Sequence, residues 1–387
     1  MRGMIIDPGF FLAGLAIFLI VVWDAFEAII LPRRVTRKFR LTRFYYRTSW
    51  AIWTSITGLI TSRKIRESYL GFYGPISLLI LVGVWAVGLV ISFGFMQFGA
   101  GSAVSLAGTS STSRISTDLY LSGTTFFTLG LGDVIPRSGL ARFLVVTEAG
   151  FGFGFLAAVI GYLPFIYGSF AQREVNISLL DSRAGTPPTA GELLRRHSFP
   201  TGLDALGQLL KDWELWSAQL MESHLSYPVL AYFRSQHDNQ SWIASLTAIL
   251  DTCALTMSGI EGACEKQAEL TFAIARHAIV DLSQIFSAAP HALPHDRLPD
   301  EVLQKLRATL AQSGMVLRTT PEAEQKLKEL RRMYEPYLYA LATYLRQTLP
   351  PWIPLKKGKD NWQTTAWAYE TGTGATEKSA LTHDDHF

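Results

Sequence analysis

Three long apolar runs constrain this chain more than any other feature of its sequence. They occupy residues 8–31, 73–98 and 139–168. A helix needs about 20 apolar residues to cross the hydrocarbon core of a bilayer. Only 17% of the residues are charged, against roughly 25% in soluble proteins. We therefore expect a first transmembrane helix within residues 1–32, an outer helix at 75–98 that begins at Pro75, and an inner helix at 140–168.

Positive charge gathers between the first two runs. By the positive-inside rule this segment, residues 33–72, faces the cytoplasm. The N-terminus is then outside, and everything after the third run is cytoplasmic. The pattern predicts a multi-pass protein of the cell membrane, that is, of an inner membrane or a plasma membrane. The basic residues are Arg33, Arg34, Arg37, Lys38, Arg40, Arg43, Arg47, Arg63, Lys64 and Arg66.

Residues 33–72 predict a basic segment on the inner membrane surface, with membrane lipid as a partner. We expect a helix at about 41–66 that lies in the interface. Its aromatic anchors would be Tyr45, Tyr46, Trp50 and Trp53. Arginine at every third position, from Arg34 to Arg43, is also the spacing of a voltage-sensor helix. A sensor bundle needs several helices to shield its charges, and only one run precedes these arginines, so the interfacial interpretation is favoured.

The segment between the last two runs predicts a re-entrant structure. Residues 117–127 form a helix too short to cross a bilayer, and the sequence Thr128-Leu129-Gly130-Leu131-Gly132-Asp133 follows it. Glycine at alternate positions allows backbone torsions closed to other residues. Successive carbonyls can then point to one side, where they can replace the hydration shell of a monovalent cation. The negative end of the short helix would face that ion.

The order of span, short helix, TxGxGD loop and span resembles the pore module of the potassium channel superfamily, over about residues 73–168. The match includes Thr128, Gly130, Gly132 and Asp133. Leu131 replaces the tyrosine of the TVGYG loop, as in the second pore of two-pore-domain potassium channels. The resemblance implies an all-α membrane protein with three transmembrane helices, a re-entrant pore helix and a cytoplasmic helical bundle.

The resemblance also implies roles for the loop residues. The backbone carbonyls of Thr128, Leu129, Gly130 and Leu131 and the Thr128 hydroxyl would coordinate K⁺, with no cofactor beyond the permeant ion. One loop supplies one quarter of such a ring, so a homotetramer is expected. Leu131 leaves open a non-selective monovalent cation channel. A third hypothesis, of another class, is a non-conducting membrane-anchored sensor or scaffold.

The inner helix carries glycines that have two interpretations. Gly150, Gly152, Gly154 and Pro164 can form a gate or hinge, with Gly152 at the hinge position that the resemblance implies. Small residues also allow close helix packing in membranes. Both interpretations stay open at this point.

Carboxyl groups within the apolar runs are candidates for function. Glu148 could face the ion pathway and attract cations, or hydrogen-bond the back of the filter, or pack protonated between helices. Asp24 and Glu27 are expected to pair with neighbouring arginines near the cytoplasmic interface.

The second half of the chain reads as a helical cytoplasmic domain. We expect a linker at 169–190, helices of period 3.6 at 191–350, and a disordered polar tail at 351–387. Arg234, His237 and Trp242 could bind an unidentified anionic or aromatic ligand, although helix capping is the favoured interpretation. We find no metal motif, phosphate loop, nucleophile–base pair or nucleic-acid signature, so we expect neither an enzyme nor a nucleic-acid partner.

Overall fold

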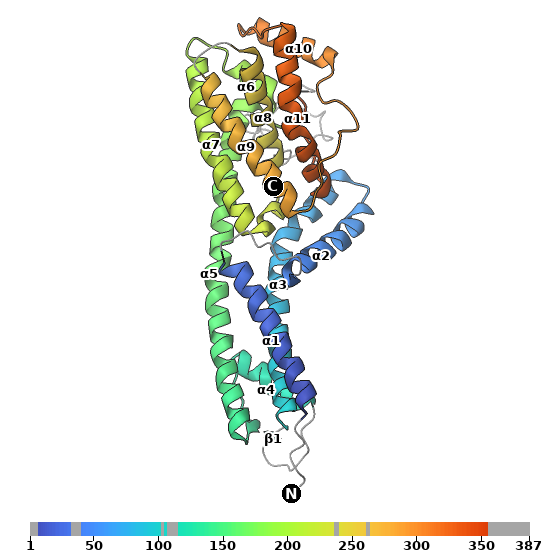
Figure 1. The fold of residues 1–387 in the computed structure, drawn as a ribbon, viewed down its shortest axis with the longest axis vertical. Coiled ribbons are helices and arrows are strands. Elements are labelled where there is room, and N and C mark those ends of the chain that lie inside the picture. The colour runs from blue at the N-terminus through green and yellow to red at the C-terminus, as the bar shows by residue number, and fades with distance from the viewer. Residues whose placement is uncertain are drawn as a thin grey trace, which may run out of the picture. The chain divides into compact units, whose positions relative to one another are not determined.

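The computed structural model describes residues 7–31, 40–101, 104–106, 115–235, 240–260 and 264–354. The chain divides into two compact units, residues 1–168 and 169–387, which we call unit 1 and unit 2. Unit 1 contains α1 (Pro8–Ile29), α2 (Leu41–Gly58), α3 (Arg63–Gly99), β1 (Val104–Leu106), α4 (Ile115–Phe126), β2 (Val134–Pro136) and the first part of α5 (Gly139–Ala184) (Figure 1).

Small residues bring α1 and α3 into backbone contact. A Cβ atom added at Gly14 would lie 2.5 Å from the Ser92 carbonyl oxygen, and one added at Gly99 would lie 2.3 Å from the Phe11 nitrogen. No side chain fits at either position. Close approach of this kind is how helices associate in a bilayer, where apolar side chains gain little by leaving the lipid.

The two buried carboxylates of α1 have different partners. Glu27 pairs with Arg40 at 3.4 Å, as expected. Asp24 instead accepts hydrogen bonds from Trp85 Nε1 at 2.9 Å and from the backbone N–H of Thr42 at 3.1 Å. Asp24 therefore caps the N-terminus of α2 from another helix. Of the arginines expected near it, Arg33, Arg34 and Arg37 lie outside the described residues.

Helix α2 ends earlier than predicted, at Gly58, and its aromatic residues pack on α3. Tyr46 and Trp50 are buried, and the Trp50 and Tyr73 rings lie 4.7 Å apart. Trp53 Nε1 donates to the Tyr69 carbonyl at 3.1 Å. These side chains thus pack between α2 and α3. The prediction that all four aromatic residues serve as interfacial anchors needs correction.

The same packing explains why the outer helix begins before Pro75. Helix α3 starts at Arg63 and runs through Pro75 without a break. A proline removes one backbone hydrogen bond, which membrane helices tolerate when neighbouring groups compensate. Leu70 and Tyr73, in the turns before Pro75, are buried. Proline was therefore not the helix start that the sequence predicted.

Unit 1 also contains two short strands, a correction to the all-α prediction. Strands β1 and β2 pair antiparallel, with Ser105 opposite Ile135. Each strand has three residues, too few for a recognisable alternation of apolar and polar residues. The pair connects the segment after α3 to the residues that follow Asp133.

The inner helix is longer than predicted. Residues 169–184 were expected to belong to a linker, but α5 continues to Ala184. The physical reason is burial at helical spacing, because Ile177, Leu180 and Ala184 have 2%, 1% and 0% of their surface exposed. Unit 2 therefore begins inside α5.

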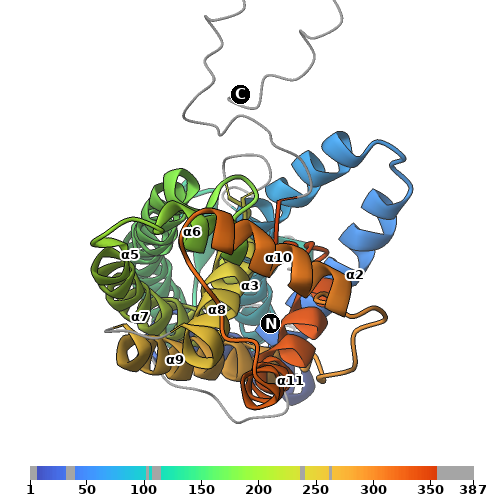
Figure 2. The same ribbon diagram turned by 90° about the horizontal axis from the view of Figure 1, so that it is seen from above.

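The rest of unit 2 is helical. It contains α6 (Ala190–Arg196), α7 (Gly202–Ser226), the 3₁₀ helix η1 (Pro228–Tyr232), α8 (Trp242–Gly259), α9 (Glu265–Ile285), α10 (Asp300–Gln312) and α11 (Pro321–Tyr344). Among the described residues, α1, α3, α5 and α8 are long and apolar enough to cross a membrane. For α8, 94% of the apolar window is buried inside the unit, and α6, α7, α9 and α11 surround it (Figure 2). We therefore assign α8 to the core of unit 2.

The first residues after α11 pack against the rest of unit 2. Trp352 is 0% exposed, and its carbonyl accepts a hydrogen bond from the Gly191 N–H at 2.9 Å. The guanidinium of Arg297 lies over the Trp352 ring. The prediction of a disordered tail is therefore wrong for residues 351–354, and residues 355–387 lie outside the described part of the chain.

Candidate functional site

The short helix α4 lies in unit 1 between α3 and α5 (Figure 1). It spans Ile115–Phe126, close to the predicted 117–127. Its 12 residues rise about 18 Å, well short of the roughly 30 Å hydrocarbon core. A Cβ atom added at Gly94 of α3 would lie 2.7 Å from the Leu119 side chain, so α4 packs tightly on α3. A helix of this length cannot cross a membrane.

The loop after α4 has an alternating backbone. Thr128, Gly130 and Gly132 have φ of 56°, 56° and 76°, whereas Leu129 and Leu131 are not in the positive-φ region. Positive φ at alternate residues is the torsion pattern that can turn successive carbonyls to one side. For Thr128 the left-handed conformation costs roughly 1–2 kcal/mol, so the surrounding structure must stabilise it.

Hydrogen bonds from the end of α4 stabilise this loop. The Thr124 carbonyl accepts from the N–H of Leu129 at 2.8 Å and of Gly130 at 3.5 Å. The Thr128 N–H donates to the Thr125 carbonyl at 3.0 Å. The last turn of α4 thus fixes the first half of the loop.

Asp133 fixes the other end of the loop. Its Oδ2 accepts a hydrogen bond from Tyr120 Oη of α4 at 2.9 Å, and its Oδ1 accepts from the Val134 N–H at 3.1 Å. Tyr120 was not singled out in the sequence. A tyrosine in a short apolar helix gives no local signal for a partner 13 residues away.

The loop is open on one side in the single chain. The side chains of Leu129 and Leu131 are 61% and 62% exposed. No atom would lie within 4 Å of a Cβ added at Gly130 or Gly132. Helix α5 also has exposed apolar side chains, with Val146, Phe153 and Ile160 all more than half exposed.

Gly152 of the inner helix is in close contact with α4. A Cβ atom there would lie 2.3 Å from the Phe126 carbonyl oxygen, whereas Gly150 and Gly154 face open space within the chain. Helix α5 runs through all three glycines and Pro164 without a break. The contact gives Gly152 a role in packing.

Glu148 of α5 lies against α4. It is 0% exposed, and its Oε1 is hydrogen-bonded to the Ser122 hydroxyl of α4. Of the three interpretations of Glu148, this position does not favour a carboxylate that faces the ion pathway.

Two of the three residues proposed for a ligand site in unit 2 bond within the chain. The Arg234 guanidinium donates to the carbonyls of Leu345 and Arg346, and Trp242 is 0% exposed with Nε1 3.4 Å from the Ala231 carbonyl. His237 lies outside the described residues. Arg234 thus bonds to carbonyls at the C-terminal end of α11, and Trp242 packs inside unit 2.

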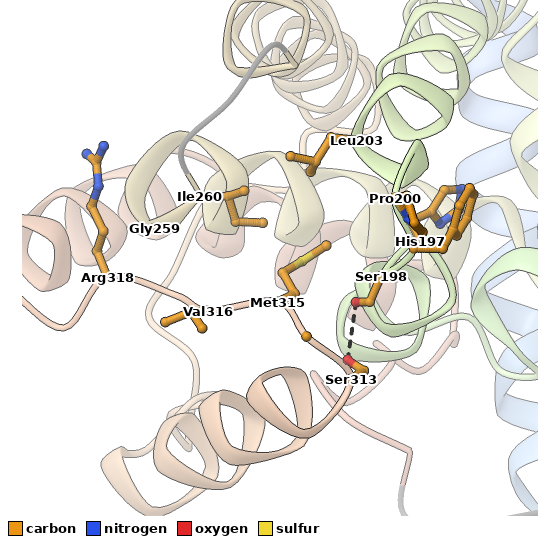
Figure 3. Close-up of a pocket in the computed structure, with 12 residues that line it drawn as sticks. His197, Ser198, Pro200, Leu203, Gly259, Ile260, Ser313, Met315, Val316 and Arg318 are labelled. Atoms are coloured by element: carbon orange, nitrogen blue, oxygen red, sulfur yellow. Dashed lines mark hydrogen bonds between the residues drawn. The ribbon is translucent and has the colours of Figure 1, made fainter.

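Unit 2 has a cavity of about 660 Å³ elsewhere, between the α6–α7 connection, the end of α8 and the α10–α11 connection. Figure 3 shows Ser198 and Ser313 hydrogen-bonded at its wall, at 3.2 Å. Ser198 Oγ also donates to the Leu194 carbonyl, and His197 Nδ1 lies 2.7 Å from the Leu193 carbonyl. These polar groups already bond within the chain, so they indicate no ligand chemistry. No group of three metal-ligating side chains occurs in the described parts of the chain.

Comparison with known proteins identifies one region. The sequence model of a family described as ion channel matches residues 79–164. This range begins inside α3, includes α4 and the loop at 128–133, and ends at Pro164 of α5. No curated protein and no solved structure matches the chain. The match supports an ion-channel domain with transmembrane helices, over less than a quarter of the chain.

Proposed function

We propose that four copies of this chain form a channel that conducts K⁺ passively across the cell membrane. The observation that carries the proposal is the loop at 128–133, with positive φ at alternate residues, at the end of a helix too short to cross a bilayer. Its location inside the ion-channel match supports it. The carbonyls of Thr128, Leu129, Gly130 and Leu131, with the Thr128 hydroxyl, would replace the water around the ion.

The proposed number of copies follows from the geometry of the ion. One loop presents carbonyls from one side only, and a cation needs them all around. The open side of the loop and the exposed apolar face of α5 are surfaces that a second copy can cover. Closed cyclic symmetry is the usual way in which identical chains bury such faces. The assembly we propose is therefore a C4 homotetramer.

Selectivity for K⁺ over Na⁺ is the finer part of the proposal. Leu131 has no hydroxyl group to brace the loop from behind. The hydrogen bond between Tyr120 and Asp133 provides a brace at the outer end instead. If that brace is insufficient, the same pore is a non-selective monovalent cation channel, and the experiment below separates the two.

We further propose that unit 2 is cytoplasmic and gates or assembles the pore through α5. Arg173, in the part of α5 that belongs to unit 2, is 4% exposed. Its guanidinium donates to the carbonyls of Leu230 at 2.9 Å and Phe233 at 2.8 Å, and contacts His224 Nε2 at 3.2 Å. The same helix contains Gly152, which touches α4. A change in unit 2 that moves Arg173 therefore acts on the helix that contacts the pore helix.

Ion flux into liposomes tests the proposal. The purified protein is expected to pass K⁺ in preference to Na⁺, and Ba²⁺ should block this flux. Gly130→Ala should abolish selective flux, because alanine at φ +56° is strained by about 1–2 kcal/mol per loop. The matched control is Gly58→Ala in α2, where the added methyl group meets nothing within 4 Å. Equal Na⁺ and K⁺ flux favours the non-selective channel, and no flux from the wild type refutes the proposal.

A further inference from the structure

One hydroxyl group of the pore helix joins three helices of unit 1. Ser122 Oγ lies 2.7 Å from the Val90 carbonyl oxygen of α3 and in hydrogen-bond contact with Glu148 Oε1 of α5. Ser122 and Glu148 are both 0% exposed. The outer helix, the pore helix and the inner helix therefore meet at this side chain, away from solvent.

The number of hydrogen atoms at Ser122 decides the direction of these bonds. A serine hydroxyl carries one hydrogen, and a backbone carbonyl can only accept. The hydrogen of Ser122 is therefore donated to Val90. The contact between the oxygens of Ser122 and Glu148 then needs a hydrogen from Glu148, and a carboxyl group donates only when it is protonated.

The surroundings of Glu148 agree with a neutral acid. No cation of the described residues interacts with it, and its Oε2 is buried without a hydrogen-bond partner. An ionised carboxylate without a partner in a dry interior costs far more than a neutral acid in the same position. Hydrogen-bond counting and burial thus lead independently to the same protonation state.

Ser122 is close to the groups that hold the loop. It precedes Thr124 by two residues on the same helix, and the Thr124 carbonyl accepts the N–H groups of Leu129 and Gly130. A shift or rotation of α4 at Ser122 would move this carbonyl and the first half of the loop with it. Whatever fixes Ser122 between α3 and α5 therefore fixes the start of the loop.

We propose that Glu148 is a positioning residue for the loop at 128–133. As a neutral acid it donates to Ser122, which donates to Val90, and this directional relay holds the pore helix between the outer and inner helices. Glu148 acts through Ser122 and does not touch the ion. The inference rests on the proposed function, because the position of the loop is measured through the ion selectivity of the channel.

Two substitutions of Glu148 separate hydrogen donation from charge. Glutamine is neutral, and its amide N–H can donate to Ser122, so Glu148→Gln should keep the K⁺/Na⁺ permeability ratio within about twofold of wild type. Glu148→Leu has similar volume and no donor. We expect it to lower the ratio about fivefold, which is about 1 kcal/mol, the usual worth of one hydrogen bond. Reversal potentials of the reconstituted full chain measure both.

The relay also predicts how Ser122 behaves. Ser122→Ala removes the bonds to both Val90 and Glu148, so it should lower the ratio at least as much as Glu148→Leu. The double variant should lose nothing beyond Ser122→Ala, because the bond that Glu148→Leu removes is then already absent. Full additivity of the two losses overturns the relay. So does a Glu148→Gln variant that loses as much selectivity as Glu148→Leu, or a Glu148→Leu variant that keeps the wild-type ratio.

Infrared spectroscopy gives a readout that does not depend on conduction. At neutral pH the difference spectrum of wild type minus Glu148→Gln should contain the carbonyl stretch of a protonated carboxyl group, and Ser122→Ala should shift this band. Absence of the band overturns the inference. If the wild type carries no K⁺ current, the proposed function fails, and the infrared band alone then supports or overturns the relay.

Discussion

Gly152→Ala tests whether the inner-helix glycines serve packing or bending. The added methyl carbon would lie 2.3 Å from the Phe126 carbonyl oxygen, and real Cβ atoms essentially never come closer than 3.0 Å to another heavy atom. Either α5 or the end of α4 has to move. Phe126 is two residues from Thr128, so the displacement reaches the start of the loop.

The size of the displacement decides the expected outcome. Functional groups must be held within about 0.5 Å of their working geometry, and relief of this contact needs more than that. Overpacking of this kind costs about 1–3 kcal/mol, which exceeds the gain of about 1 kcal/mol from replacing glycine by alanine in a helix. We expect Gly152→Ala to unfold at a lower temperature in detergent and to lose K⁺ selectivity.

Gly154→Ala is the matched control. It lies on the same helix, gains the same helix propensity, and meets nothing within 4 Å. It should unfold at or above the wild-type temperature and keep selective flux. The packing account is refuted if Gly152→Ala behaves like the wild type while Gly154→Ala loses channel opening, since that result would mean that flexibility is what the glycines supply.

Three further predictions concern side chains that hold the loop or unit 2. Tyr120→Phe removes the donor to Asp133, worth about 1 kcal/mol, and should lower the K⁺/Na⁺ permeability ratio measured from reversal potentials; an unchanged ratio would show that Asp133 needs no brace. Arg173→Met removes two buried hydrogen bonds, to the carbonyls of Leu230 and Phe233, although the Leu230 carbonyl keeps the Phe233 N–H as a donor. It should destabilise unit 2 by about 2 kcal/mol in thermal unfolding, whereas Arg195→Met, at an exposed ion pair, should cost under about 1 kcal/mol. Burial disfavours the charged ring of His224 and holds its pKa well below the ordinary value. Near pH 6.5 the unfolded chain therefore binds more protons than the folded chain, and the free energy of unfolding should fall as the pH is lowered through about 6.5. His224→Gln should flatten this pH dependence, and an equal slope in both proteins would contradict the prediction.

The parts of the fold that the sequence predicts are those set by local chemistry. Bilayer thickness sets the length of an apolar run, so the apolar helices and the short helix α4 follow from hydropathy alone. Positive φ at Gly130 and Gly132 costs little, because glycine has no Cβ atom. Thr128 adopts the same torsion against its own preference, and only the bonds from the end of α4 explain why.

The parts that the sequence does not predict depend on contacts between distant residues. A composition rule places a linker at 169–190, but burial of Ile177 and Leu180 keeps α5 helical to Ala184. Packing against α2 likewise carries α3 through Pro75. Neither effect is visible until the partner surface is known.

Side-chain pairs at the site show most clearly that contacts between distant residues cannot be predicted from the sequence. Ser122 and Glu148 are 26 residues apart, and Tyr120 and Asp133 are 13 apart. The sequence singles out Glu148 and Asp133 by residue type and place. It gives no sign of the hydroxyl groups that they contact, because those helices meet only in the folded unit.

Cryo-electron microscopy of the full chain in K⁺ tests most directly whether four loops form one ion-binding ring. It should find four subunits around one axis, with ion density on that axis at the level of the oxygens of residues 128–131. A particle without four-fold symmetry, or one in which these oxygens face away from the axis, would contradict it.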